Sequence, residues 1–431
     1  MIEIRPTFWG VVSILAIALA GVFITNGQAP IFFRMAYLCV GLILVSCLWT
    51  LLAIRGLHIQ RTARGLRQQV GHVFEERFKL INTFAFIRPW VEVRDLSALP
   101  GIGGSKVMAV SRRGEQRGYT SYTLLKERGC FDLGPTEIAT GDPFGLFAYR
   151  KKFEKTHEIL VLPFIVELRK FPFAPSVLTG GKADRKRTTE ITPHAASVRD
   201  YAPGDSLNRI HWPTTARRDQ WMVKEFDQDP HSDVWIFLDA EKRIHYRAEE
   251  EGEDTGAATQ LWMMRQRSGT RIPADSFEYV VSAAASIGRY FLNRGQPVGL
   301  VCNGQNTLIF QAERGERQQR KILESLAYLQ SSGRLPLLGL VNSQAVHIPR
   351  GSTVILVTAS GDTGLLNAMD TLLHRSLKPV VILVDPVTFG AAYGIEALHM
   401  ALEARQIPVA VLKNGVSIQE TLEKQFVANS G

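Results

Sequence analysis

The chain has 431 residues, of which 45% are hydrophobic, and a formal net charge of +9. This length allows two or three domains, each with its own buried core. The basic residues are dispersed rather than gathered in one run, and the four cysteines show no CxxC spacing. Composition therefore argues against a disulfide framework, a zinc site and a dedicated nucleic-acid-binding segment.

Two uncharged runs dominate the N-terminal region. Phe8 to Ile24 reads "FWGVVSILAIALAGVFI", and Met35 to Ile54 reads "MAYLCVGLILVSCLWTLLAI". Each is close to the roughly 20 residues that a helix needs to cross a bilayer. A cleaved signal peptide is the alternative for the first run, but its basic n-region is poor and a second run follows at once. We expect a transmembrane helical hairpin over residues 1–56.

Arginines are distributed unevenly around the two runs. The segment between them carries only Arg34 on its side. Four arginines follow the second run: Arg55, Arg61, Arg64 and Arg67. The positive-inside rule then places both termini in the cytoplasm, so we expect a multi-pass protein of the inner or plasma membrane with a cytoplasmic body.

Residues 57–170 show short strand-like runs with almost no helical period. The runs include "WVEVRDL", "KVMAVSRR" and "ILVLP", and the turns between them include "LPGIGG" and "TGDPFG". This pattern predicts a β-sandwich-like domain. Residues 171–232 are expected to form a polar linker followed by a segment with a dense motif.

Residues 233–431 follow a different pattern, in which buried-strand runs alternate with helical ones. The strand runs are "VWIFLD", "PVGLVCN", "TVILVTA", "PVVILVD" and "PVAVLK". The helical runs are "FEYVVSAAASIGRYFLNR", "RQQRKILESLAYLQ", "GLLNAMDTLLHRS" and "GIEALHMALEAR". Such alternation predicts an α/β doubly wound domain with a parallel sheet. Its functional edge is then formed by the loops after Asp239, Thr358 and Asp385.

The residue spacing of several motifs does not support a catalytic or ligand-binding function. "GIGGSK" at Gly101–Lys106 lacks the full phosphate-loop pattern and is better explained as a turn. The acidic run at residues 249–254 is typical of a solvated loop rather than a metal site. His194, His211 and His231 have no metal-ligand spacing, and no serine lies in a GxSxG elbow. A hydrolase therefore has little support from motifs.

The segment "RDYAPGDSLNRIHWPTTARR" is the densest motif of the chain. Its pattern residues are Arg199, Tyr201, Pro203, Gly204, Asp205, Arg209, Ile210, Trp212, Ala216 and Arg217. This pattern resembles the signature of the bacterial domain of unknown function 58 family. The resemblance extends to "FEERFKLIN", "WVEVRD", "RGCFDLGP", "GDPFGLF" and the double-span anchor. It implies a von Willebrand factor A-like α/β domain and an association with MoxR-type AAA+ ATPases.

The residues of the signature also indicate a local structure. Pro203 and Gly204 suit a type II turn, and Asp205 suits the cap of a short helix. On that helix Ile210 and Trp212 would bury apolar surface. Arg209 and Arg217 offer forked donors to carboxylates. Three readings stay open: a structural clasp, a docking surface for a partner, and a catalytic site built from Asp205 and His211.

The von Willebrand factor A resemblance raises the question of whether the residues of a metal site are present. Metal-binding members hold a divalent cation with a D-x-S-x-S loop, a threonine and an aspartate. Here the loop is "DAEKR", so Asp239 is followed by Glu241 and Arg243 instead of two serines. Thr358, Ser360 and Asp362 could supply oxygens from a later loop. We regard Asp239, Thr358 and Asp362 as a degenerate site, and expect no metal and no cofactor.

These features predict a non-enzymatic, membrane-anchored adaptor that faces the cytoplasm. By resemblance, it works with a MoxR-type AAA+ ATPase in the assembly or maturation of envelope complexes. Its expected partners are the lipid bilayer, this ATPase and other envelope proteins. The alternative is a membrane-bound hydrolase that uses the polar residues of the signature. Nucleic-acid binding through Lys182, Arg185, Lys186 and Arg187 is weaker, because no aromatic platform accompanies them.

Overall fold

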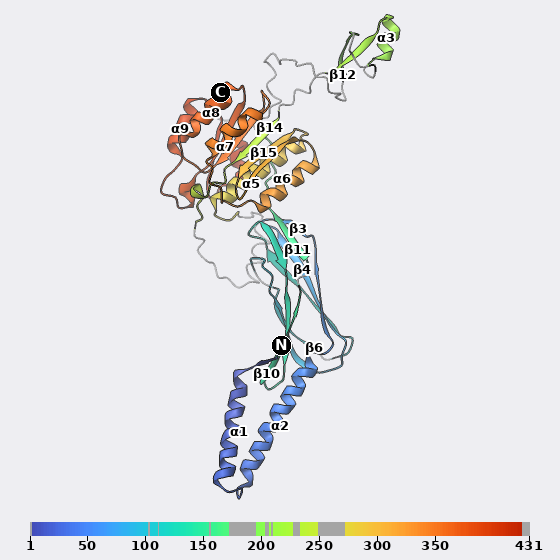
Figure 1. The fold of residues 1–431 in the computed structure, drawn as a ribbon, viewed down its shortest axis with the longest axis vertical. Coiled ribbons are helices and arrows are strands. Elements are labelled where there is room, and N and C mark those ends of the chain that lie inside the picture. The colour runs from blue at the N-terminus through green and yellow to red at the C-terminus, as the bar shows by residue number, and fades with distance from the viewer. Residues whose placement is uncertain are drawn as a thin grey trace. The chain divides into compact units, whose positions relative to one another are not determined.

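The structure, a computed structural model, describes residues 2–101, 104–110, 112–154, 157–171, 195–202, 207, 210–226, 233–248 and 272–424. The chain divides into two compact units (Figure 1). The first consists mainly of Met1–Phe164, and the second mainly of Ile165–Ala248, Ala274–Ile322 and Leu329–Gly431. The first unit holds the apolar helices and most of the β-structure, and the second holds an α/β sheet.

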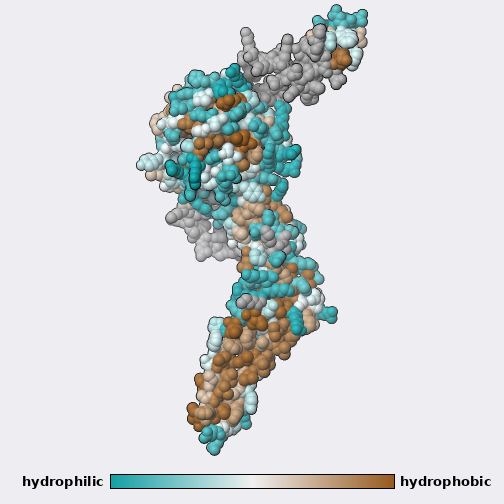
Figure 2. Space-filling view, viewed as in Figure 1, coloured by the Kyte–Doolittle hydropathy of each residue, from teal (hydrophilic) through white to brown (hydrophobic). Residues whose placement is uncertain are grey.

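Two apolar helices, α1 (Pro6–Ile24) and α2 (Pro30–Ala53), begin the first unit. Each starts with a proline, which lacks the N–H that the first turn of a helix leaves unpaired. Both are long and apolar enough to cross a membrane, and only 6% and 22% of their apolar windows are buried. Figure 2 shows their hydrophobic surface. These helices, which match the two expected runs, suggest a membrane anchor.

The remainder of the first unit is β-rich, as the sequence predicts. One sheet has the order β1-β10-β9-β5-β6, and two smaller sheets have the orders β2-β4-β7 and β3-β11-β8. Their strands are β1 (Ile2–Ile4), β2 (Leu57–Ala63), β3 (Arg67–Gln69), β4 (Val73–Asn82), β5 (Arg88–Asp95), β6 (Lys106–Val110), β7 (Gln116–Leu124), β8 (Gly129–Leu133), β9 (Thr136–Gly141), β10 (Phe147–Phe153) and β11 (His157–Leu162).

Alternation along the strands builds two apolar cores in this unit. On β4, Phe74, Phe78 and Leu80 point inward at every second or fourth position. Phe74 belongs to a cluster with Leu133 of β8. Leu80 belongs to a second cluster with Ile138 of β9. The strand therefore joins both cores through one face.

The two ends of the helical hairpin are both bonded to this β-structure. Before α1, β1 pairs antiparallel with β10, with Ile4 opposite Phe147. After α2, the buried side chain of Arg88 on β5 donates hydrogen bonds to the carbonyl oxygens of Ala53 and Arg55. The N-terminal strand and the β-rich unit therefore lie on the same side of the hairpin.

The second unit contains a six-stranded sheet with the order β16-β15-β14-β17-β18-β19. All neighbouring strands are parallel except the β15–β16 pair. The strands are β14 (Val234–Leu238), β15 (Val298–Asn303), β16 (Thr307–Glu313), β17 (Thr353–Thr358), β18 (Lys378–Val384) and β19 (Val409–Leu412). The central strands β14 and β17 are buried along their whole length, as expected when helices cover both faces.

Helices pack on both faces of this sheet. Trp235 and Phe237 of β14 lie in a core with residues of α7, α8 and α9. On the other face of β14, Ile236 lies against α5 at Gly288. A Cβ atom added to Gly288 would lie 3.5 Å from Cδ1 of Ile236. The helices are α5 (Ser276–Asn293), α6 (Glu316–Tyr328), α7 (Leu337–Gln344), α8 (Leu365–His374), α9 (Glu396–Ala404) and α10 (Ile418–Lys424).

The five strand runs and four helical runs of the sequence coincide with elements of this unit. The antiparallel strand β16 and the helices α7 and α10 are additional to that expectation. β16 was missed because it is an edge strand whose exposed and half-buried residues alternate, so it has no continuous apolar run. The likeness to von Willebrand factor A domains stays a prediction.

Candidate functional site

The signature segment contains a small β-hairpin with a helix between its strands. Strand β12 (Ala195–Asp200) pairs antiparallel with β13 (Met222–Phe226), and the helix α3 (Trp212–Arg218) lies between them in the sequence. Figure 1 shows the paired strands and the helix together. We call the described residues 195–202, 207 and 210–226 the signature module.

Main-chain hydrogen bonds hold the module together. The Tyr201 amide donates to the Trp221 carbonyl at 2.8 Å, and the His211 amide donates to the Met222 carbonyl at 2.8 Å. The Met222 amide in turn donates to the Thr215 hydroxyl at 3.1 Å. These bonds attach both ends of the irregular connection to β13, so the module has local structure of its own.

The prediction that one helix buries both Ile210 and Trp212 is wrong. We expected Ile210 and Trp212 on one helix that buries them, but α3 begins at Trp212, with His211 as its N-cap residue. Pro213 fits the first turn of α3, where the backbone N–H that proline lacks would have no partner within the helix. Ile210 is buried through a β-bridge to Val223, whereas Trp212 is 66% exposed.

The other predicted signature residues fall into two groups. Pro203, Gly204, Asp205 and Arg209 lie outside the described residues, so the type II turn and the Asp205 cap stay predictions. The backbone of Arg199 lies in β12 opposite Val223. Tyr201 is half-buried, and its ring meets the Trp221 ring edge-to-face at 5.4 Å. Arg217 is exposed on α3.

Apolar and basic side chains are exposed together on this module. Trp212, Trp221 and Leu207 are 66%, 54% and 61% exposed. Arg217 and Arg218 are exposed in the last turn of α3. Tryptophan and arginine are the residues that most often dominate binding energy at protein interfaces. We call these five side chains the signature surface.

His211 has a local hydrogen-bond partner. Its Nδ1 lies 2.7 Å from the Thr214 hydroxyl, within the first turn of α3. Asp205, the acid paired with it in the catalytic interpretation, lies outside the described residues. The geometry of His211 is therefore accounted for by the start of the helix.

The sheet brings Asp239 and Thr358 together, as the strand order requires. They follow the adjacent strands β14 and β17, and the Thr358 hydroxyl donates to Asp239 Oδ2 at 2.7 Å. The Glu241 amide donates to Asp239 Oδ1 at 3.2 Å. Burial raises the pKa of Asp239 to about 6, although both hydrogen bonds oppose that shift.

The third candidate, Asp362, is used differently. It is exposed, and its Oδ1 accepts a hydrogen bond from the Gly364 amide at 2.8 Å within its own loop. Both oxygens of Asp239 already accept hydrogen bonds. Among the residues that the structure describes, no group of three or more His, Cys, Asp and Glu side chains could hold a metal ion.

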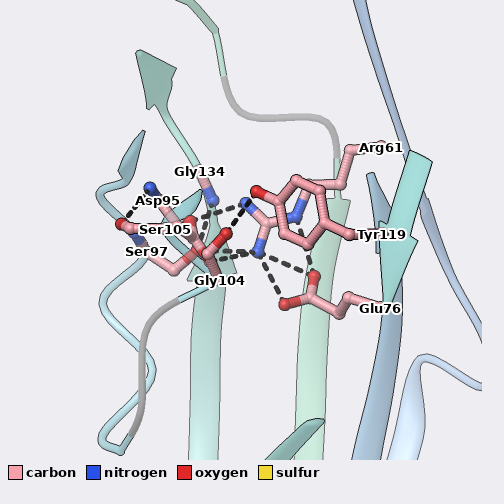
Figure 3. Close-up of polar contacts among 8 residues, drawn as sticks. All are labelled: Arg61, Glu76, Asp95, Ser97, Gly104, Ser105, Tyr119 and Gly134. Carbon is pink, nitrogen blue, oxygen red and sulfur yellow. Dashed lines mark hydrogen bonds and ion pairs between the residues drawn. The ribbon is translucent and has the colours of Figure 1, made fainter. Parts of the chain in front are cut away.

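A buried ionic cluster in the β-rich unit was not expected from the sequence (Figure 3). Arg61 on β2 donates from Nε to Glu76 on β4 at 2.7 Å and from Nη1 to Asp95 on β5 at 2.9 Å. Its Nη2 also donates to the Ser97 hydroxyl at 2.8 Å. The cluster connects two different sheets, so it acts as a polar clasp between them.

Burial and charge oppose each other at this cluster. The side chains of Arg61, Glu76 and Asp95 are 3%, 2% and 5% exposed. Burial raises the pKa of Glu76, and the neighbouring Arg61 guanidinium limits that rise. The missed signal is alternation: Glu76 shares the inward face of β4 with Phe74 and Phe78. A carboxylate on such a face requires a buried cation.

Comparison with known proteins finds a family match within the second unit. The family model described as "Protein of unknown function DUF58" matches residues 197–386. "Uncharacterized protein YeaD" of Bacillus subtilis (strain 168) is 26% identical over 289 residues. These matches support the DUF58 family. The DUF58 match includes the signature module from Ser197 onward and the strands β14 to β18. The alignment with YeaD covers 60% of this chain and 63% of YeaD, which is less than two thirds of its length.

Similar solved structures cover smaller parts of the chain. The CARDB domain of the PF1109 protein from Pyrococcus furiosus is 10% identical, with 24% of this chain and 91% of that chain covered and a TM-score of 0.18. A beta-glucosidase from Listeria innocua is 11% identical, with 24% and 16% covered and a TM-score of 0.16. At such scores neither likeness carries an argument about this chain.

Proposed function

We propose that this protein is a non-enzymatic adaptor, anchored in the inner or plasma membrane by α1 and α2, that binds a protein partner through the signature surface. The helices cross the bilayer as a hairpin, and the two units face the cytoplasm. The partner is a MoxR-type AAA+ ATPase, and the complex acts on other envelope proteins. The von Willebrand factor A likeness of the sheet and the ATPase rest on the family resemblance.

The exposed signature surface is the observation that carries this proposal. Trp212 and Trp221 each expose more than half of their area, and Arg217 and Arg218 are exposed on the same module. Among the described residues of the module, Ile210, Met222 and Val223 are buried, whereas Trp212 is not. Exposed aromatic rings and arginines on one module suit a partner that offers an apolar pocket and acidic side chains.

The arginine distribution supports the cytoplasmic orientation. Arg5, Arg55, Arg64 and Arg67 lie on the side of the hairpin that carries the β-rich unit, and only Arg34 lies near the turn. Basic residues near the ends of spans are retained in the cytoplasm. Because β1 is bonded to the same unit as the chain after α2, two crossings satisfy both observations.

Co-purification from native membranes tests the proposal. Arg217→Glu combined with Arg218→Glu should lower the recovered AAA+ ATPase at least about tenfold, since like charge at an interface costs several kcal/mol. The matched control is Arg317→Glu with Arg320→Glu, two exposed arginines on α6, which should leave recovery unchanged. Equal recovery in all three proteins would place the partner site elsewhere.

A further inference from the structure

Two loops of the β-rich unit expose large apolar side chains. Between β4 and β5, Phe84 is 39% and Ile87 is 65% exposed. Between β9 and β10, Phe144 is 56% exposed. Hydrogen bonds hold the backbone of these loops. For example, Asp142 Oδ2 accepts from the Phe144 amide at 2.9 Å. Looseness of the loops therefore does not explain the exposure of the three side chains.

The first loop is held against the end of α2. The Phe86 ring lies 4.9 Å from the Trp49 ring of α2. The Thr83 amide donates to the carbonyl oxygen of Gly56 at 2.8 Å. Arg88, where β5 begins, donates to the carbonyl oxygen of Arg55 at 2.6 Å. The loop therefore lies at the level where α2 enters the β-rich unit.

The second loop is held in the same way against the start of α1. The Arg5 amide donates to the carbonyl oxygen of Leu146 at 3.0 Å. The Thr7 hydroxyl donates to the carbonyl oxygen of Gly145. The Phe8 ring lies 5.3 Å from the Phe147 ring. Both loops are thus fixed at the ends of the two apolar helices that face the unit.

The neighbouring side chains are those of a membrane–water interface. Trp9, in the first turns of α1, is 64% exposed, and the Arg5 guanidinium lies 5.0 Å from the centroid of the Trp90 ring. Arg55 is exposed just after α2. Tryptophan and arginine collect where spanning helices leave the hydrocarbon core. Apolar side chains next to the ends of the helices are stabilised when they enter the headgroup region of the bilayer.

We propose that the loops carrying Phe84, Ile87 and Phe144 insert into the interface of the bilayer that α1 and α2 cross. The β-rich unit then rests on the membrane surface instead of standing off it on a flexible stalk. The bilayer is chosen as the occupant because this surface is continuous with the helices that enter it. The inference rests on the anchoring part of the proposed function, and its test separates the two.

Depth measurement on the full chain tests the inference. Single nitroxide labels are placed at Ile87→Cys and Phe144→Cys in a cysteine-free protein reconstituted into phosphatidylcholine–phosphatidylglycerol vesicles. Leu44→Cys, in the exposed face of α2, reports the span. Leu96→Cys is the matched control: it is 44% exposed and follows the other end of β5, roughly 30 Å from Ile87 at about 3.3 Å per residue.

Relaxation by oxygen and by a water-soluble nickel chelate gives the depth of each label. We expect the oxygen-to-nickel ratio at positions 87 and 144 to lie severalfold above that at position 96 and below that at position 44. Ratios at 87 and 144 equal to that at 96, with position 44 still deep, would overturn the inference and leave the anchor intact. A water-exposed label at position 44 would overturn both.

Discussion

Arg88 donates a hydrogen bond from Nη2 to the carbonyl oxygen of Arg55, 2.6 Å away and two residues beyond the end of α2. Its Nε donates to the carbonyl oxygen of Ala53, the last residue of that helix. Helix C-termini carry partial negative charge and unpaired carbonyl groups, which a cation stabilises. The side chain is 1% exposed, and burial lowers the pKa of its guanidinium.

Replacing Arg88 should therefore loosen the joint between α2 and the β-rich unit. Arg88→Leu removes the donor to the buried carbonyl group of Ala53 and to three partly buried carbonyl groups, and we expect a loss of about 3 kcal/mol or more in the free energy of unfolding of this unit. Arg94→Leu on the same strand is the control, because the ion pair of Arg94 with Glu92 is partly exposed and worth at most about 1 kcal/mol. Hydrogen exchange of β5 amides in detergent measures both, and equal protection in the two variants would contradict the role of Arg88.

The Arg61 clasp gives a prediction with a defined pH dependence. Arg61→Leu leaves Glu76 and Asp95 buried without their cation, which should cost about 3–5 kcal/mol at pH 8. Loss of Arg61 raises the pKa of Glu76 further, because the guanidinium opposes the effect of burial. A carboxyl whose folded pKa lies above its unfolded value loses stability as pH rises through the folded pKa. The penalty should therefore be smaller at pH 5.

Denaturant unfolding of the full chain at both pH values measures this effect. The double variant Arg61→Leu, Glu76→Leu removes the most buried carboxylate as well and should recover part of the loss at pH 8. If Arg61→Leu lowers the free energy of unfolding equally at pH 5 and pH 8, the titration of Glu76 does not account for the effect.

Asp239 should titrate near neutrality and not near its ordinary value. Burial raises its pKa to about 6, so the folded state retains a proton that the unfolded state has lost. Its contribution to stability is complete below about pH 4 and falls as pH rises to about 6, by roughly 2–3 kcal/mol. Asp239→Asn should lack this fall. Infrared difference spectra of the protonated-carboxyl band check the assignment, and a band unchanged by Asp239→Asn would refute it.

The sequence predicted regular elements well where one periodicity dominates. The buried runs of β14, β17 and β18 and the long amphipathic helix α5 each correspond to an observed element. Asp239 and Thr358 were placed at one sheet edge because both follow the carboxyl ends of predicted parallel strands, and the Thr358 hydroxyl lies 2.7 Å from Asp239 Oδ2. This prediction needed only strand order and direction.

Features that depend on pairing between distant strands were not predictable. Arg61, Glu76 and Asp95 come from three strands of two sheets, and nothing in a single strand indicates that they meet. Trp212 was expected to bury apolar surface on a helix with Ile210, but it is the first residue of α3 and is 66% exposed. Exposure depends on what surrounds a residue, and a local pattern does not contain that information.

Membrane topology can be tested in intact cells. If α1 and α2 cross as a hairpin and the arginines after α2 lie in the cytoplasm, protease added outside should not cut the chain beyond α2 until the cells are opened. Cleavage after permeabilisation serves as the control for accessibility. Removal of the signature module by protease outside sealed cells would reverse the proposed orientation.

The central claim is that the signature surface binds an AAA+ ATPase. A photoreactive amino acid in place of Trp212, in the full chain in living cells, tests it most directly, with Tyr393 as an 85% exposed control position in the second unit. We predict that the ATPase, identified by mass spectrometry, is crosslinked from position 212 and at least about tenfold less from position 393, as expected for an interface centred on one tryptophan. Crosslinking of the ATPase from position 393 alone, equally from both positions, or from neither would contradict the account.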